Sequence, residues 1–310
     1  MEAYPQVVLT PGSTSYFSQP EDHLDPNLFD GLDMRESVRR ELLGLLTDTL
    51  VSFTHNPVAW VKLWLAGSGA SYQWSASRNP GDLDMLIGVN YPVFRQFNPS
   101  FTQLSNQEIS QYLTDKLRER LTPRTAHWSP PGAPGAEYEV TWYSNPESTD
   151  IRDIHPYAAF ELIHRTWDVP PDPDPMKPSH DVQADRDHVL ASTIVDRYTR
   201  AQSQLVQQTN PTLRSQAEKI VNDSLAQASA LFDEIHEGRH AAFGWGGHGY
   251  ADPANYRWQA GKASGVVPAL LELRNFYKGE ESADEIRKYG VNLPSTDTLL
   301  LRALIAQNDR

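Results

Sequence analysis

Three acidic positions and one Gly-Ser pair in the first half of the chain have the types and spacing for phosphate chemistry. Asp82 and Asp84 lie in the β-prone run 82–89 (DLDMLIGV), and residues two apart in a strand point to the same face. Two carboxylates on one face form a hard-oxygen site that suits Mg²⁺, with Mn²⁺ as the alternative ion. A third carboxylate from the expected strand 137–143 would complete a two-metal site. Glu139 is the first candidate for this third acid, and Glu137 on the same face is its competitor.

The Gly67-Ser68 pair supplies the second requirement of phosphate chemistry, groups that bind phosphate. It follows the β-prone run 61–66 (VKLWLA) and precedes an expected short helix over 70–77. Backbone N–H groups of such a turn, together with the Ser68 hydroxyl, can contact the phosphates of a nucleotide. Gly67 allows the close approach and unusual dihedrals that this requires. The simpler interpretations are that Ser68 is a small turn residue and that Asp82 is a turn residue after Pro80-Gly81. A turn-residue explanation does not suit Asp84, because burying an unpaired carboxylate within an apolar run costs free energy.

These residues resemble a known superfamily. The segment 65–89 (LAGSGASYQWSASRNPGDLDMLIGV) is similar to the hG[GS]…DhD signature of the DNA polymerase β-like nucleotidyltransferases. Segments 139–169 and 256–276 further resemble nucleotidyltransferase-like proteins of actinobacteria and their phages. The resemblance implies that Asp82 and Asp84 bind the metal, that Gly67 and Ser68 contact the triphosphate of an NTP, and that Glu139 is the third acid, although the superfamily more often has Asp there.

The second half of the chain offers one more candidate and one ambiguous cluster. Helical domains of this superfamily often present a Lys to the triphosphate, which makes Lys262, in the Gly-rich segment QAGKASG, the candidate; the alternative is a solvated surface Lys. Basic and aromatic residues alternate over 239–262, a pattern that suits either single-strand binding or helix packing, and packing is favoured here. His155, His164, His180 and His188 lack a metal-ligand spacing such as HExxH, and we expect no zinc site.

The surrounding patterns predict an α/β (α+β) fold. Apolar spacing predicts a helix over 33–53, and Ser105 with Glu108 three residues later starts another over 105–121. We therefore expect a nucleotidyltransferase core of mixed β-sheet flanked by helices over 1–168, including an irregular N-terminal arm. A Pro-rich linker over 169–183 and a helical domain over 184–310 follow, with helices at 184–208, 212–236, 255–277 and 295–307.

Composition limits the class of protein and of partner. The chain has 310 residues with no Cys, which excludes disulfides and thiolate chemistry. Its net charge of −13 argues against a broad surface for duplex DNA. No apolar run reaches the length of a membrane span, no secretory signal is evident, and we expect a cytoplasmic protein.

The sequence thus predicts Mg²⁺-dependent transfer of a nucleoside monophosphate from an NTP to a hydroxyl acceptor, with release of pyrophosphate. The acceptor stays open among an RNA 3′ end, a small molecule, a protein hydroxyl and a second nucleotide. The competing hypothesis is a non-catalytic nucleotide-binding or interaction protein built on the same scaffold.

Overall fold

The chain forms two compact units, each with its own core. The structure, a computed structural model, describes residues 4–289 except 75–79, 146–148, 179 and 245. One unit contains the described parts of 15–176 and 243–249, and the other contains those of 4–14, 177–242 and 250–289. Residues 4–14, which the sequence patterns assign to the sheet domain, belong to the helical unit in the structure. The predicted helix over 295–307 lies outside the described residues.

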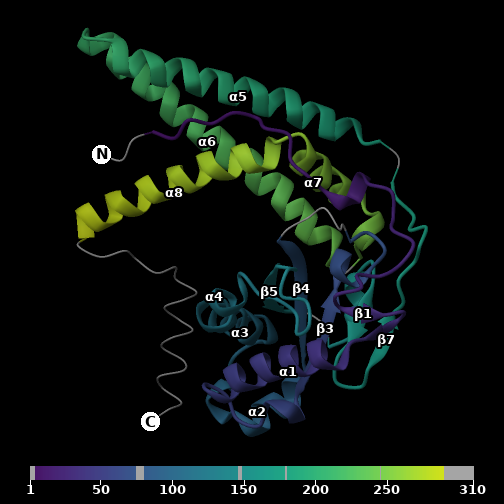
Figure 1. The fold of residues 1–310 in the computed structure, drawn as a ribbon. Coiled ribbons are helices and arrows are strands. Elements are labelled where there is room, and N and C mark those ends of the chain that lie inside the picture. The colour runs from purple at the N-terminus through teal and green to yellow at the C-terminus, as the bar shows by residue number, and fades with distance from the viewer. Residues whose placement is uncertain (1–3, 75–79, 146–148, 179, 245, 290–310) are drawn as a thin grey trace. The chain divides into compact units, whose positions relative to one another are not determined.

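A five-stranded mixed sheet forms the centre of the first unit (Figure 1). The helices and strands of this unit are β1 (Phe29–Asp30), β2 (Asp33–Met34), α1 (Glu36–Val51), β3 (Val61–Ala66), β4 (Gly81–Val89), α2 (Tyr91–Phe97), α3 (Asn106–Arg120), α4 (Thr122–Thr125), β5 (Tyr138–Ser144), β6 (Ala159–Glu161) and β7 (Thr166–Val169). The strand order is β5-β4-β3-β6-β7, in which β4 and β5 run parallel and the other neighbours run antiparallel. The predicted mixed α/β architecture is confirmed.

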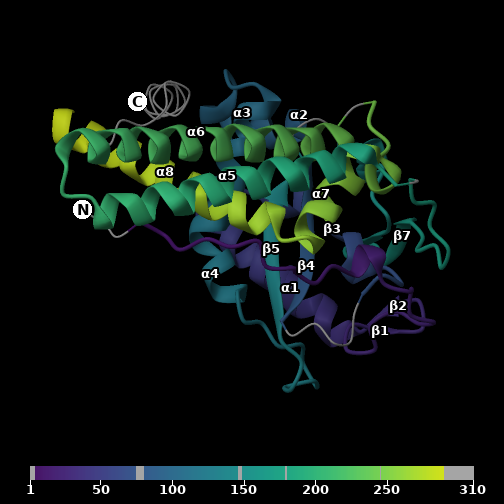
Figure 2. The same cartoon turned by 90° about the horizontal axis from the view of Figure 1, so that it is seen from above.

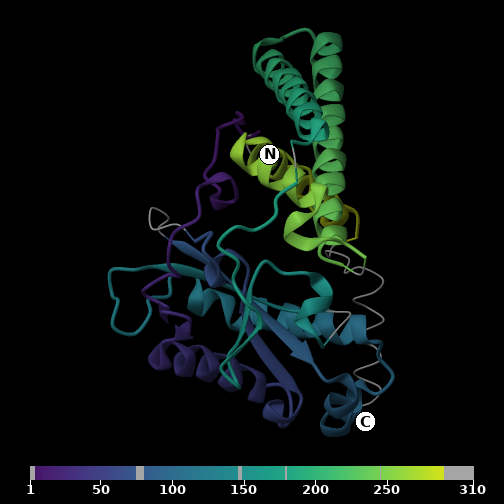
Figure 3. The ribbon, with the colours of Figure 1, turned by 90° about the vertical axis from the view of Figure 1, so that its right-hand side faces the viewer.

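One face of this sheet packs against α1 and α3. The buried residues of α1 recur every four positions, which places them on one side of the helix (Val38, Leu42, Leu46 and Leu50). They share a core with alternate residues of β3 and β4, among them Leu63, Leu65, Met85 and Ile87. Figure 3 shows α1 lying along the strands. The capping box predicted for α3 is present, since Ser105 and Glu108 cap each other's backbone N–H groups.

A smaller apolar cluster covers the opposite face of the sheet. It contains the fully buried Trp64 together with Leu86 and Ile151. The indole Nε1 of Trp64 donates to Asp168 Oδ2 at 2.7 Å, so the buried donor is satisfied. Asp82 and Asp84 have the same parity along β4 as Leu86 and therefore belong to this second face, at the start of the strand.

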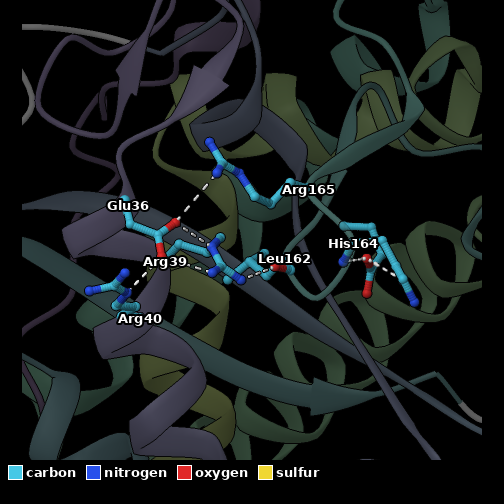
Figure 4. Close-up of polar contacts among 7 residues, drawn as sticks. Glu36, Arg39, Arg40, Leu162, His164 and Arg165 are labelled. Carbon is cyan, nitrogen blue, oxygen red and sulfur yellow. Dashed lines mark hydrogen bonds and ion pairs between the residues drawn. The ribbon is translucent and has the colours of Figure 1, made fainter.

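An ion-pair network anchors the turn between β6 and β7 to the first turn of α1 (Figure 4). Arg39 Nη1 donates to the Leu162 carbonyl at 2.9 Å, while Glu36 accepts two hydrogen bonds of 2.9 Å from the same guanidinium. Arg165, which adopts a φ of 60° in this turn, lies 3.7 Å from Glu36. The sequence patterns did not predict β6 and β7, because both strands are only three to four residues long.

The second unit consists of α5 (Val182–Gln207), α6 (Pro211–Ala242), α7 (Pro253–Ala263) and α8 (Val266–Tyr289). Helix α6 packs against both α5 and α8 (Figure 2). The predicted single helix over 255–277 is broken, because Gly265 adopts a φ of 82° that ends α7. A Cβ at Gly265 would lie 2.4 Å from the Thr10 carbonyl oxygen, so the N-terminal segment also requires glycine there.

Candidate active site

The two aspartates of β4 project together from one face of the sheet. Asp82 and Asp84 are half-buried, while Leu83 between them is buried in the core against α1. The alternation follows from strand geometry and matches the prediction. The Thr141 hydroxyl, directly across on β5, donates to Asp84 Oδ1 at 3.2 Å and orients this carboxylate.

The Gly67-Ser68 turn lies directly against Asp84. Ala66, the last residue of β3, is the register partner of Asp84, so the turn that follows begins beside this carboxylate. A Cβ at Gly67 would lie 2.9 Å from Asp84 Oδ2, and the φ of Gly67 is 73°. Both the contact and the dihedral exclude a larger residue. The structure therefore brings together the predicted phosphate turn and one of the predicted metal ligands.

The short helix predicted after the Gly67-Ser68 turn is absent over residues 71–74. Residues Gly67–Ala70 form a single 3-10 turn rather than the beginning of a helix over 70–77, the last part of which lies outside the described residues. Gly67 N donates to the Ala158 carbonyl at 3.2 Å, so this amide is already engaged. A Cβ at Gly69 would lie 2.6 Å from Leu83 Cδ2, and the small residue allows the turn to pack on β4.

The third acid remains a prediction. Glu139 is the register partner of Asp82 on β5 and, by parity, shares its face, although it is exposed. Glu137 precedes the strand and lies 2.5 Å from His127 Nδ1. Within the residues that the structure describes, no three His, Asp or Glu side chains gather closely enough to hold one ion. The carboxylate pair and the Ser68 hydroxyl nevertheless have the donor chemistry that Mg²⁺ and an NTP need.

A cavity of about 620 Å³ opens at this end of the strands. Ser68 and Asp82 both line it, together with Trp74 and with Asp25 and Asn27 from the N-terminal arm. Asp84 and Glu139 are not among the described lining residues. A volume of this size accommodates a nucleotide or a small acceptor.

Asp25 is a site residue that the sequence patterns missed. It is 3% exposed, and its Oδ2 accepts a hydrogen bond of 2.5 Å from the Tyr138 hydroxyl. Asn27 contributes its backbone N–H to Asp25 Oδ1 and its side-chain amide to the Tyr138 oxygen. Burial and the Asp25 carboxylate raise the pKa of Tyr138, which keeps the hydroxyl protonated as a donor. The segment Asp25-Pro26-Asn27 has the pattern of an ordinary turn, so only the folded structure shows its contact with Tyr138.

The candidates from the second half of the chain belong to the helical unit. Lys262 lies half-buried in the last turn of α7, and its proposed contact with the triphosphate remains a prediction. Trp258 is 8% exposed in the helical core, with the Arg239 guanidinium 4.9 Å above its ring. Arg257 is held by the buried Asp187 and by Glu234. Trp258 therefore serves helix packing, as the sequence pattern predicted, and Arg257 serves ion pairing within the helical unit, whereas Trp245 lies outside the described residues.

Comparisons add no functional assignment. No protein family, curated protein or solved structure matches this chain. Among the described residues, no helix has the length and apolar character required to cross a membrane. The fold is a mixed α/β sheet unit followed by helices α5–α8.

Proposed function

We propose that this chain is a Mg²⁺-dependent nucleotidyltransferase of the DNA polymerase β-like type, which transfers a nucleoside monophosphate from an NTP to a hydroxyl acceptor. The observation that carries the proposal is the contact between the Gly67-Ser68 turn and the carboxylate of Asp84. This contact supports the interpretation that a phosphate-binding turn and a metal-binding strand act on the same triphosphate.

In the proposed reaction the acceptor oxygen forms a bond to the α-phosphorus of the NTP. The bond from this phosphorus to the oxygen that bridges to the β-phosphate breaks, and pyrophosphate leaves. Asp82 and Asp84 would hold Mg²⁺, which neutralises phosphate charge. Ser68 would orient the terminal phosphates, and Glu139 would accept the proton of the acceptor hydroxyl. Positioning of the reactants and neutralisation of phosphate charge supply most of the rate enhancement in phosphoryl transfer.

The position of a radioactive label tests the reaction. With Mg²⁺ and a cell extract as the acceptor source, we expect label from an α-labelled NTP to enter an acceptor and label from a γ-labelled NTP to leave as pyrophosphate. Asp84→Asn should reduce transfer by at least about 100-fold, because the charge that opposes the cation is lost. Asp48→Asn, an equal exchange at an exposed position of α1, is the matched control. NTP binding by calorimetry without label transfer would instead support the non-catalytic alternative.

The lining of the cavity favours a small acceptor without a phosphate backbone. Its described lining contains the carboxylates Asp25, Asp82 and Glu137, and no Lys, Arg or His. Bound Mg²⁺ would neutralise charge on the NTP, but the further phosphates of an RNA 3′ end would add uncompensated negative charge near these carboxylates, which a neutral or cationic hydroxyl compound would not. Mass spectrometry of metabolite, protein and RNA pools after expression of the parent chain and of Asp84→Asn should find the new nucleotidyl adduct among small molecules. An adduct confined to RNA would contradict this preference.

A further inference from the structure

Two histidines near the end of α6 point their ring nitrogens at one another. His236 and His240 lie one helical turn apart, and their Nε2 atoms are 3.3 Å from each other. The ring planes are nearly perpendicular, at 87°. Because residues four apart share a helix face, both imidazoles lie on the same side of α6.

This separation is the one that a shared metal ion requires. Two nitrogens bound to one tetrahedral ion at about 2.0–2.1 Å lie about 3.3–3.4 Å apart. The segment His236-Glu237-Gly238-Arg239-His240 also has the HExxH spacing, which places two imidazoles on one side of a helix. We infer that His236 and His240 form a two-imidazole site for a first-row divalent transition-metal ion such as Zn²⁺ or Cu²⁺.

The surroundings hold one ligand in place and leave the other accessible. The His236 ring stacks on Phe232, with a centroid separation of 5.4 Å, and also contacts Trp258. His240 is exposed and can adjust to an incoming ion. Of the nearby cations, Arg274 is paired with Asp233 at 2.7 Å and Arg239 lies over the Trp258 ring. The carboxyl end of a helix carries partial negative charge, which favours a cation there.

The site has two protein ligands in the described part of the chain, where no group of three or more exists. Water or a second molecule would fill the remaining positions. A two-ligand site discriminates among metals mainly by their intrinsic preference for imidazole, so Cu²⁺ should bind more tightly than Zn²⁺. The expectation of no zinc site rests on His155, His164, His180 and His188, none of which belongs to this pair.

Equilibrium dialysis and Cu²⁺ paramagnetic resonance on the full chain, freed of any affinity tag, test the inference. We expect nitrogen ligation in the Cu²⁺ spectrum and a Zn²⁺ site that His240→Gln weakens at least about tenfold. His188→Gln, an equal exchange at an exposed position of α5, should leave both unchanged. His240 is exposed, so its replacement leaves the fold intact, which circular dichroism checks. Equal Zn²⁺ binding by the parent and His240→Gln, or a Cu²⁺ spectrum without nitrogen ligation, would overturn the inference.

Discussion

At the scale of single residues, the candidate site depends on side chains that are small or absent. Gly67 has a positive φ and faces Asp84 Oδ2, so any Cβ there must displace the carboxylate. Gly67→Ala should therefore destabilise the chain by about 1–2 kcal/mol and reduce nucleotidyl transfer. Gly44→Ala is the control, because no atom lies within 4 Å of a Cβ at this position of α1 and alanine favours a helix. Denaturant unfolding of both variants checks the prediction, and equal stabilities would contradict it.

A second prediction at this scale concerns the contact between the N-terminal arm and β5. Tyr138→Phe removes the hydroxyl that donates to the buried Asp25 and leaves one carboxylate oxygen without that donor. The expected loss is about 1–3 kcal/mol in the free energy of unfolding. Urea denaturation measures it. If Tyr138→Phe unfolds at the same urea concentration as the parent chain, then Asp25 does not depend on this hydrogen bond.

At the scale of elements, α1 fixes the β6–β7 turn through charge. The hydrogen bond and charge of Arg39, with those of Arg40, lower the pKa of Glu36 from an ordinary 4.5 to about 2. A carboxylate with a lowered folded-state pKa stabilises the fold above its unfolded value, and this contribution disappears as the pH falls. We expect the parent chain to exceed Glu36→Gln in stability at pH 6 and the difference to shrink between pH 4.5 and 2. Urea unfolding midpoints of both chains across this pH range test the expectation. A stability difference that is constant with pH would show that ionised Glu36 does not stabilise the fold.

At the scale of the whole molecule, the two units have separate apolar cores. The ion pair of Asp187 with Arg257 belongs to the helical unit, and Asp187 is 2% exposed. Asp187→Ala removes the buried partner of the Arg257 guanidinium and leaves Glu234 as its carboxylate, a loss of about 1.5–3 kcal/mol. Hydrogen exchange should accelerate in α5–α7 and stay unchanged in β3–β5.

The exposed pair of Asp196 with Arg200 on α5 provides the control for this change. Its side chains are 69% and 80% exposed and 4.0 Å apart. Asp196→Ala should alter stability by less than about 1 kcal/mol. Acceleration of exchange in β3–β5 that equals that in α5–α7 for Asp187→Ala would show that the units unfold as one.

The sequence predicted those features that depend on local pattern. The alternation in β4 predicted that Asp82 and Asp84 share a face, and the Ser105 cap predicted the start of α3. Features set by distant contacts were missed. The contact of Thr10 with Gly265 and the hydrogen bond of Asp25 with Tyr138 join residues far apart in the chain, whereas the helix end at Gly265 had a local glycine signal. The HEGRH segment carries a local signal for the histidine pair, because its two histidines are four residues apart on a helix.

The most direct test of the central claim is the rate of pyrophosphate release from an NTP with Mg²⁺ and an acceptor-containing extract. We expect release by the parent chain and by Asp48→Asn, and a loss of at least about 100-fold in Asp82→Asn and in Asp84→Asn. Release that persists in both variants while the fold is intact would show that the carboxylates beside the Gly67-Ser68 turn have no part in the chemistry.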